Sequence, residues 1–413
     1  MDVQLGSCNS SIELTICNML ARSLASLVPL HRESYPVIAI TGPRQSGKTI
    51  LAQSAADDLK YVNLEHPFER VAATQDPLQF LGRFPDGAIL DEVQYAPELL
   101  SYLQARVDAD RSRGRWLVTG SHQLQLGRSL AQSLAGRVVR LELLPFSYSE
   151  LATSKRRPRT LAEAVFRGGY PRLYDESAPE PIGWLDQYIS DFIDRDVRQL
   201  LEIRDRFAFG RFMHLCAAHT GQSINLSSFG QALGIGHNTV SAWMGVLEAC
   251  YVIRLQRPHS RNFGKRITKA PKLYFVDSGL ACRLLHITDL QQVMDHPNWG
   301  ALVETWCVSE ILKTRLHRGL KDNLWFWRSH DGLEVDVVIE SGTTLIPIEI
   351  KSSLTPDTSD GAPIRKLREL AAAAGGTSIA PGFIISGGNE MRPMGTERLV
   401  PWHSIADVLG GIP

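Results

Sequence analysis

The sequence predicts an α/β protein built from several folding units. Three patterns favour this class: an apolar run that breaks at Gly42 and resumes with helical spacing, a series of short helical stretches between 206 and 249, and a helix followed by alternating strands after residue 299. At 413 residues the chain is longer than one hydrophobic core usually supports. We therefore expect a chain divided into the segments 1–155, 156–205, 206–285 and 286–413.

The composition is that of an ordinary globular protein. The 44 basic residues balance the 44 acidic ones, so any surface for a polyanion must be local. The six cysteines lie far apart and lack zinc-ligand spacing, which indicates reduced core thiols. The first thirty residues lack the pattern of a signal peptide, and no stretch reaches 18 uninterrupted apolar residues. We expect a cytoplasmic protein without a membrane segment.

A phosphate-binding loop follows the first predicted strand. The stretch "VIAITGPRQSGKTILAQSAA" is a strand, a loop and a helix, and its loop matches the pattern G-x-x-x-x-G-K-[ST] in full. In such loops the backbone N–H groups and the helix N-terminus cradle the β- and γ-phosphates. We expect ATP to be held by Gly42, Pro43, Arg44, Gln45, Ser46, Gly47, Lys48 and Thr49. Lys48 would reach the phosphates, and Thr49 would bind Mg²⁺.

An acid pair ends the next apolar strand, "GAILDEVQ". An Asp-Glu pair leaving a buried strand suits ATP hydrolysis, because one carboxylate can hold Mg²⁺ through water while the other orients or deprotonates the attacking water. Asp91 takes the first role in this prediction, and Glu92 takes the second.

Two further features would complete the catalytic site. The strand "RWLVTG" leads into Thr119 and Ser121, and parallel sheets bring such strand ends together, so either hydroxyl would poise the water as a sensor or would cap a helix. Arg137 follows a helical stretch in "SLAGRVV". It is our candidate for an arginine supplied to the γ-phosphate of a neighbouring subunit; the alternative is a surface arginine.

The segment 206–285 has the order of a winged helix. A long helix with apolar residues from Trp184 to Val197 precedes it as a lid or linker. Then come short helical stretches, of which Ser227 and Ser228 cap the second, followed by the strand "CYVIRLQ". In a winged helix the third helix can enter a DNA major groove. Its predicted exposed positions are Asn238, Thr239, Ser241 and Trp243.

A basic stretch follows that third helix. Between 254 and 272 lie Arg254, Arg257, Arg261, Lys265, Arg266, Lys269 and Lys272, with no acid among them. This is the local positive patch that DNA contact requires. From it we select Arg257, Arg261, Lys265 and Arg266 as DNA contacts, together with Asn238 and Thr239. The alternatives are a solvated loop and a winged helix that binds protein.

The last segment predicts the order αβββαβ. Its helix is "WGALVETWCVSEILKTRL", and the strands "LEVDVVIES" and "TLIPIEIKSS" carry charged residues two apart, which point to one face. Carboxylates of Asp336 and Glu349, with Glu304 from the helix, offer oxygen ligands for Mg²⁺, and Lys351 would stabilise charge on a phosphate. The alternative is a cross-strand ion pair. The pattern D-x₁₂-E-x-K resembles the PD-(D/E)XK restriction-endonuclease-like fold.

The chain from about 20 to 405 resembles a group of bacterial and archaeal AAA+-type ATPases with a C-terminal restriction-endonuclease-like domain. The residues that carry the resemblance are "TGPRQSGKT", "ILDEVQYAPELL", "TGSHQL", "LAGRVVRLELLPFSYSEL", "GGYP", "NFGKRITKAPKLYFVDSGL" and "EVDVVIE" with "IPIEIK". The resemblance implies a P-loop AAA+ ATPase domain, a winged-helix domain and a nuclease-like domain. It also implies a homo-oligomer, such as a hexameric ring.

Three hypotheses of function follow. The first is an oligomeric ATPase or motor that acts on branched or single-stranded DNA. The second is an ATP-regulated, Mg²⁺-dependent DNA nuclease that uses Glu304, Asp336, Glu349 and Lys351. The third is a nucleotide-dependent switch that binds a protein partner.

Overall fold

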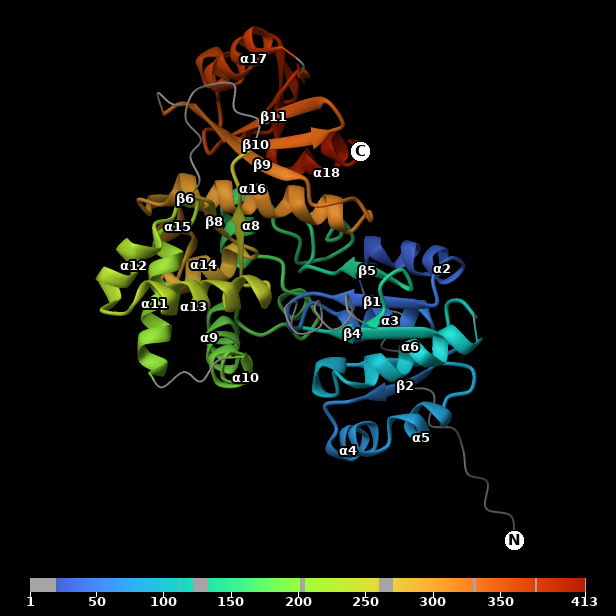
Figure 1. Ribbon diagram of the computed structural model, residues 1–413. Helices are drawn as coiled ribbons and strands as arrows, with labels where there is room; N and C mark the ends of the chain where they lie inside the picture. The colour runs from blue at the N-terminus through green and yellow to red at the C-terminus, as the bar shows by residue number, and fades with distance from the viewer. Residues whose placement is uncertain are drawn as a thin grey trace.

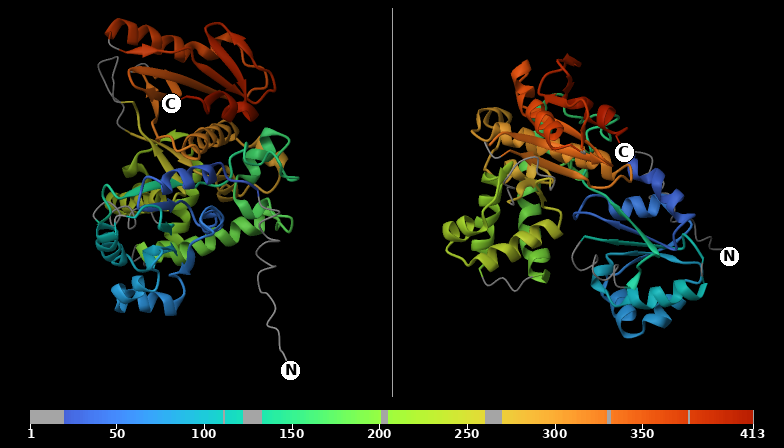
Figure 2. Two further views of the ribbon diagram at one scale, coloured as in Figure 1. Left: turned by 90° about the vertical axis from the view of Figure 1, so that its right-hand side faces the viewer. Right: turned by 45° about the horizontal axis from the view of Figure 1, so that its top comes forward.

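The structure is a computed structural model that describes residues 20–110, 112–121, 133–200, 205–259, 270–329, 332–375 and 377–412. Its long helix α16(Trp299–Leu316) lies between the C-terminal sheet and the central helices (Figure 1), and the N-terminal sheet lies beside them. Two further views (Figure 2) show the same three bodies. None of the helices in these ranges is long and apolar enough to cross a membrane.

The N-terminal sheet is parallel and has the order β2-β3-β4-β1-β5. Its strands are β1(Val37–Thr41), β2(Lys60–Asn63), β3(Ala88–Asp91), β4(Trp116–Gly120) and β5(Val138–Glu142). Its helices are η1(Ser23–Ser26), α2(Leu27–Arg32), α3(Lys48–Ala55), α4(Pro67–Gln75), α5(Pro77–Gly82), η2(Val93–Tyr95) and α6(Leu99–Asp110).

Both faces of this sheet are buried. Side chains alternate along a strand, so Ile38 and Ile40 pack in one core with Leu24 and Leu51, while Val37 belongs to the other core with residues of α5 and α6. This explains the near-continuous apolar character of the strands. The parallel order of the sheet places the carboxyl ends of β3, β4 and β1 side by side.

The central segment is helical, with one small antiparallel sheet of order β6-β8-β7. Its helices are α8(Leu161–Arg167), η3(Pro171–Leu173), α9(Pro181–Asp191), η4(Phe192–Val197), α10(Arg198–Leu200), α11(Arg206–Ala218), α12(Leu226–Leu233), α13(His237–Ala249), α14(Ser278–Leu284) and α15(Leu290–Asp295). Its strands are β6(Gln222–Ser223), β7(Ile253–Gln256) and β8(Lys272–Phe275).

Two local predictions for this segment need correction. The cap of α12 is Asn225, whose side chain accepts from the N–H groups of Ser227 and Ser228, so those serines are the capped positions and not the cap. The long lid helix does not run on as an α-helix, because η4 is a π-helix that begins at Phe192. A π-helix shifts the following side chains around the axis.

The buried carboxylate of Asp277 joins two motifs of this segment. It accepts from the N–H of Gly169 at 2.7 Å and caps α14 through the N–H of Leu280. A Cβ on Gly168 would lie 2.1 Å from Asp277 Oδ1, so only glycine fits there. The motifs "GGYP" and "VDSGL" therefore hold α8 against α14, and their role is structural.

The C-terminal segment has the predicted order αβββαβ and then adds strands. Its sheet follows β14-β15-β13-β11-β10-β9, with β12 beside β11. The strands are β9(Leu324–Arg328), β10(Glu334–Ser341), β11(Thr344–Lys351), β12(Ser378–Ile379), β13(Phe383–Ser386), β14(Arg392–Met394) and β15(Glu397–Pro401). After α16, the helices are η5(Thr358–Gly361), α17(Ala362–Ala374), η6(Trp402–Ser404) and α18(Ile405–Leu409).

One hydrophobic core joins the central and C-terminal segments. It runs from Leu144 to Leu409 and includes residues of α11, α13 and α16. The four cysteines in the described ranges are buried free thiols, as expected from their scatter: Cys216, Cys250, Cys282 and Cys307.

Candidate functional site

The phosphate-binding loop connects β1 to α3. A Cβ on Gly42 would lie 2.1 Å from the carbonyl oxygen of Leu143, so the first loop position admits only glycine. Gln45 adopts a left-handed backbone, with φ of 60°. The hydroxyl of Ser46 is buried and has no hydrogen-bond partner among the described residues. Such an orphaned polar atom inside the loop fits a site that takes a polar ligand.

Lys48 points back into the loop. Its Nζ donates to the carbonyl oxygens of Gly42 at 3.1 Å and Pro43 at 2.8 Å. Burial lowers the pKa of this ammonium, although Glu92 and Asp91 oppose that shift. The cation is therefore enclosed at the place where a phosphate would replace two weak carbonyl partners.

Asp91 lies at the end of β3, between hydroxyl groups from three other elements. Thr49 Oγ1 donates to its Oδ2 at 2.9 Å, the hydroxyl of Tyr61 donates to the same oxygen at 2.8 Å, and Thr119 donates to Oδ1. The predicted pair of Thr49 and Asp91 is thus assembled, and a set of oxygen ligands fits Mg²⁺. Tyr61 was not anticipated, because a tyrosine in a strand is usual in any sheet.

Glu92 follows in a left-handed backbone, with φ of 57°. For a residue other than glycine this conformation costs energy and is typical of functional positions. Its N–H donates to Thr119 Oγ1 at 3.0 Å, and its Oε2 accepts from Gln94 Nε2. Ser121 Oγ accepts from the same Gln94 amide at 3.2 Å.

The two sensor candidates therefore have different partners. Thr119 binds Asp91 and the backbone of Glu92, whereas Ser121 accepts from the Gln94 amide and donates to the Glu92 carboxylate at 3.5 Å. The sheet order places β4 between β3 and β1, and this adjacency brings both hydroxyls to the acid pair. Sequence reasoning expected this meeting but did not single out Gln94.

A cavity of about 150 Å³ lies between the loop and the lid. Arg44, Gln45 and Glu92 line one side, and residues of α9 and η4 line the other. Arg44 Nε donates to Asp196 Oδ1 at 2.5 Å, and its Nη2 donates to the hydroxyl of Tyr95 at 3.3 Å. No sequence pattern marked Asp196, which is 152 residues from its partner.

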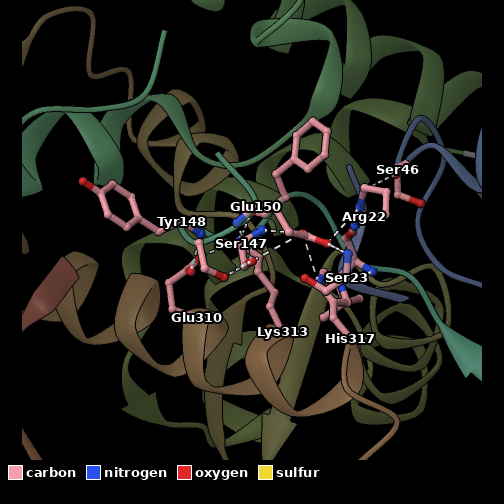
Figure 3. A network of polar contacts seen from close by, with 12 residues as sticks. Arg22, Ser23, Ser46, Ser147, Tyr148, Glu150, Glu310, Lys313 and His317 are labelled. Atoms are coloured by element: carbon pink, nitrogen blue, oxygen red, sulfur yellow. Dashed lines mark hydrogen bonds and ion pairs between the residues drawn. The ribbon is translucent and has the colours of Figure 1, made fainter. Parts of the chain in front are cut away.

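Arg22 connects the phosphate loop with α16 (Figure 3). Its guanidinium donates to the carbonyl oxygen of Ser46 at 2.8 Å and to Glu150 Oε1 at 3.2 Å. Glu150 also accepts from the N–H of Ser147 at 3.0 Å, and its Oε2 lies 3.1 Å from His317 Nδ1, just beyond the end of α16. Sequence reasoning missed this network.

Arg137 lies near the amino-terminal ends of the strands, whereas the phosphate loop lies at their carboxyl ends. It precedes β5, where its carbonyl accepts from the N–H of Val37 at the start of β1, and its side chain pairs with Asp108. It does not reach the loop of its own chain. Its action on a neighbouring subunit stays a prediction.

The predicted carboxylates of the C-terminal segment converge. Oxygens of two of them, Glu304 and Asp336, lie within 4.8 Å of one another and of Glu334, which was not among the predicted ligands; Glu349 is not part of this group. Asp336 also accepts from the N–H of Ile350 at 2.8 Å. Glu349 Oε1 accepts from Lys351 Nζ at 2.7 Å. Both residues lie on β11, so this is not the cross-strand ion pair that the alternative interpretation expected.

A lysine that sequence reasoning assigned elsewhere fills this cluster. Lys272 Nζ donates to Glu304 Oε1 at 2.6 Å and to Glu334 Oε1 at 2.5 Å, and it lies 3.8 Å from Asp336 Oδ1. Lys272 is therefore not part of an exposed basic patch. Arg254 is not a free cation of that patch either, because its guanidinium pairs with Asp322.

The remaining predicted DNA contacts have mixed outcomes. Asn238, Thr239 and Ser241 are exposed on the first turns of α13, and Arg257 is exposed after β7. Trp243 was predicted to be exposed but is buried, because the helical period places it on the face that packs against α11. Arg261, Lys265 and Arg266 lie outside the described residues.

Together, the fold and the site define an AAA-type P-loop ATPase domain. Residues 34–152 match the family described as an AAA domain. Residues 158–291 and 299–405 match two families described as domains of unknown function, DUF8612 and DUF4143.

The relatives come from several bacteria. The chain is 30% identical over 336 residues to an uncharacterized protein of Mycobacterium tuberculosis. The aligned region covers 80% of this chain and 73% of that protein. An uncharacterized protein of Haemophilus influenzae is 24% identical over 276 residues, 58% of this chain and 67% of the relative. The chain belongs to the family of the mycobacterial protein.

Two solved structures are more distantly similar. The Walker-type ATPase of Pyrococcus abyssi has 15% identity and a TM-score of 0.42, over 63% of this chain and 94% of the other. The RuvB Holliday junction branch migration motor of Thermotoga maritima has 18% identity and a TM-score of 0.31, over 56% of this chain and 88% of the other. Scores this low do not define a shared whole-chain fold.

Proposed function

We propose that this protein hydrolyses ATP and acts on DNA as an oligomeric DNA-dependent ATPase. The observation that carries the ATPase part is the assembly of Lys48, Asp91 and Glu92 at the carboxyl edge of one parallel sheet. The backbone of the loop and Lys48 would hold the phosphates of ATP. Thr49 and Asp91 would hold Mg²⁺, which would neutralise charge on the phosphates.

The protein's own groups account for the activation of water. Glu92 lines the cavity beside the loop, so its carboxylate can orient the attacking water and accept its proton. Gln94 and Ser121 hold that carboxylate, and Thr119 fixes the backbone of Glu92 relative to Asp91. Such positioning lowers the cost of reaching the reactive geometry.

The DNA part of the proposal depends on the central and C-terminal segments. We interpret α11, α12 and α13 with the sheet β6-β8-β7 as a winged helix, because three short helices precede its two main strands. Asn238, Thr239 and Arg257 are exposed there for contact with phosphates or bases. We interpret the C-terminal αβββαβ order as a restriction-endonuclease-like fold.

The test is steady-state ATP turnover without DNA and with single-stranded, duplex and four-way-branched DNA at matched nucleotide concentration. Lys48→Ala is the matched control, because it removes the phosphate cation and should abolish turnover. Strong stimulation by one DNA form supports the proposal. Turnover that every DNA form leaves unchanged would contradict the DNA part and would favour a switch that binds a protein partner.

The oligomeric part has its own test. If Arg137 acts on a neighbouring subunit, Arg137→Ala and Lys48→Ala are each inactive alone, but a mixture forms some sites with an intact Lys48 and an intact Arg137. We expect the mixture to regain turnover. A mixture that stays as inactive as its components would remove Arg137 from the site. The nuclease hypothesis is less well supported, because Lys272 lies among its carboxylates.

A further inference from the structure

The acidic cluster of the C-terminal segment is built around a cation that the chain itself supplies. Lys272 comes from β8 of the central segment, and its side chain is only 4% exposed. Its Nζ lies within 4 Å of carboxylate oxygens from α16 and from β10: Glu304 at 2.6 Å, Glu334 at 2.5 Å and Asp336 at 3.8 Å. This is a cation site whose occupant is an ammonium group.

The surroundings hold that ammonium group in place. The hydroxyl of Tyr274 donates to Glu304 Oε1 at 2.5 Å and so fixes the carboxylate that Lys272 binds. Nζ lies 5.6 Å and 5.9 Å from the ring centres of Tyr274 and Phe326, a distance at which aromatic faces attract cations. The backbone of Lys272 pairs with both β6 and β7, so the lysine is anchored in the middle strand of its sheet.

A second observation indicates that the cluster has a carboxylate oxygen that Lys272 does not use. Val337 is opposite Ile348 in the antiparallel pair β10 and β11, so Glu349 is the cross-strand neighbour of Asp336 on the same face. Glu349 is 3% exposed, and its Oε2 has no hydrogen-bond partner among the described residues. A buried carboxylate oxygen without a donor is rare, and here it lies beside the other acids.

We propose that Lys272 is the resident cation of this cluster and that it excludes divalent metal ions from it. A Mg²⁺ or Mn²⁺ ion would bind the same oxygens of Glu304 and Asp336 at about 2.0–2.3 Å, a place that the ammonium already takes. The two cations repel each other, so they exclude one another. The C-terminal segment becomes a metal site only when Lys272 leaves it.

This exclusion has a consequence for function. Because Lys272 belongs to the central segment and its acids belong to α16 and β10, metal binding requires the two segments to separate at this point or the lysine side chain to withdraw. Metal-dependent chemistry at Glu304, Asp336 and Glu349 therefore cannot take place while Lys272 occupies the cluster. The same ion pairs hold the central sheet against the C-terminal sheet.

The test is a titration of nucleotide-free protein with Mn²⁺, followed by electron paramagnetic resonance of the free ion. The variant Lys272→Met removes the ammonium and keeps the bulk of the side chain. The matched control is Arg254→Met, which removes a cation of the neighbouring strand β7 that pairs with Asp322 instead. We expect one saturable Mn²⁺ site per chain in Lys272→Met, at least tenfold tighter than any site in wild type or Arg254→Met.

Two further measurements make the result specific. The double variant Lys272→Met with Glu304→Gln should lose the new site. Without metal, the Tm of Lys272→Met should lie below that of wild type. It should rise when Mn²⁺ is added, because the ion then neutralises the negative charge of the carboxylates. ATP turnover should persist in Lys272→Met, so that failure of this inference is distinguishable from failure of the ATPase assignment.

Three outcomes would overturn the inference. One is wild-type protein that binds Mn²⁺ as tightly as Lys272→Met and loses it with Glu304→Gln, since the lysine then excludes nothing. Another is a folded Lys272→Met that gains no site. The third is a Lys272→Met, or a Lys272→Gln, that stays unfolded whether or not Mn²⁺ is present, since a divalent ion then cannot replace the lysine.

Discussion

Arg44 of the phosphate loop and Asp196 of the π-helix η4 form an ion pair at 2.5 Å across the mouth of the candidate ATP site. The Asp196 carboxylate is also close enough to Lys48 to influence its charge. An incoming phosphate therefore meets a carboxylate that already competes for the cations of the loop. The pair connects the lid to the loop.

From this pair we predict opposite effects of two substitutions. Asp196→Asn removes a negative charge that would repel the phosphates of ATP, so it should tighten nucleotide binding by about 1 kcal/mol, roughly fivefold. Arg44→Ala removes a cation and should weaken it. A titration with a fluorescent ATP analogue measures both. Asp175→Asn, which breaks an exposed pair with Arg172, is the neutral control. Weaker binding by Asp196→Asn would show that the pair prepares the loop for nucleotide instead of competing with it.

The two sensor candidates should separate in kinetics. Thr119→Val keeps the shape of the side chain but removes the hydrogen bonds to Asp91 and to the N–H of Glu92, so we expect kcat to fall about 100-fold. Ser121→Ala leaves Glu92 held by Gln94, and we expect a fall of less than about tenfold. Steady-state turnover at saturating ATP gives both values. Equal losses would mean that the two hydroxyls act as one unit.

The buried Glu150 should matter to stability. Burial favours its protonated form, but His317, Arg22 and the N–H of Ser147 outweigh burial and hold the pKa of this carboxyl well below its usual 4.5. Glu150→Gln should therefore cost about 3–5 kcal/mol at neutral pH, since it leaves the buried Arg22 guanidinium without its carboxylate partner. Asp108→Asn, which breaks the exposed pair with Arg137, should cost less than about 1 kcal/mol.

The pH dependence of this effect has a definite sign. A carboxyl whose folded pKa is depressed stabilises the fold above its unfolded pKa, near 4.5, and loses that contribution as the pH falls toward the folded value. The difference between wild type and Glu150→Gln should be constant from pH 8 to about 7, where the buried His317 beside it is neutral because burial lowers its pKa, and the Glu150 contribution should be lost below about pH 4.5. Urea unfolding at several pH values measures it. A difference that keeps growing as the pH falls below about 4.5 would contradict this assignment.

Helix α13 should show one face for packing and one for contact. Trp243 lies with its ring centre 5.2 Å from that of Phe209 and 5.4 Å from that of Phe212, so Trp243→Ala should cost about 3–5 kcal/mol. Asn238→Ala and Thr239→Ala should change stability by less than about 0.5 kcal/mol. If α13 contacts DNA, each should weaken DNA affinity roughly twofold to tenfold. Unchanged affinity in both would remove the N-terminal turns of α13 from the DNA interface.

Much of the ATP site was predictable because its information is local. The loop from Gly42 to Thr49 is a continuous motif, and Asp91 and Thr119 each end an apolar strand. Parallel strands bring such ends to one edge, so the meeting of Lys48, Asp91 and Thr119 follows from a general rule of α/β folds. The burial of Trp243 was also within reach, since Val240, Met244 and Leu247 mark its helical face.

Only the tertiary structure decided which charges meet. Lys272 was one of several basic residues in an acid-free stretch, yet it lies among acids 32 and 62 residues away in sequence. Asp196 and Glu150 likewise find their arginines 152 and 128 residues away. Pairing over such separations depends on how whole segments dock, and for Lys272 that docking is driven by the apolar core that the central and C-terminal segments share. The sequence by itself determined the elements and the phosphate loop; the packing of the three bodies determined that Lys272 fills the acidic cluster.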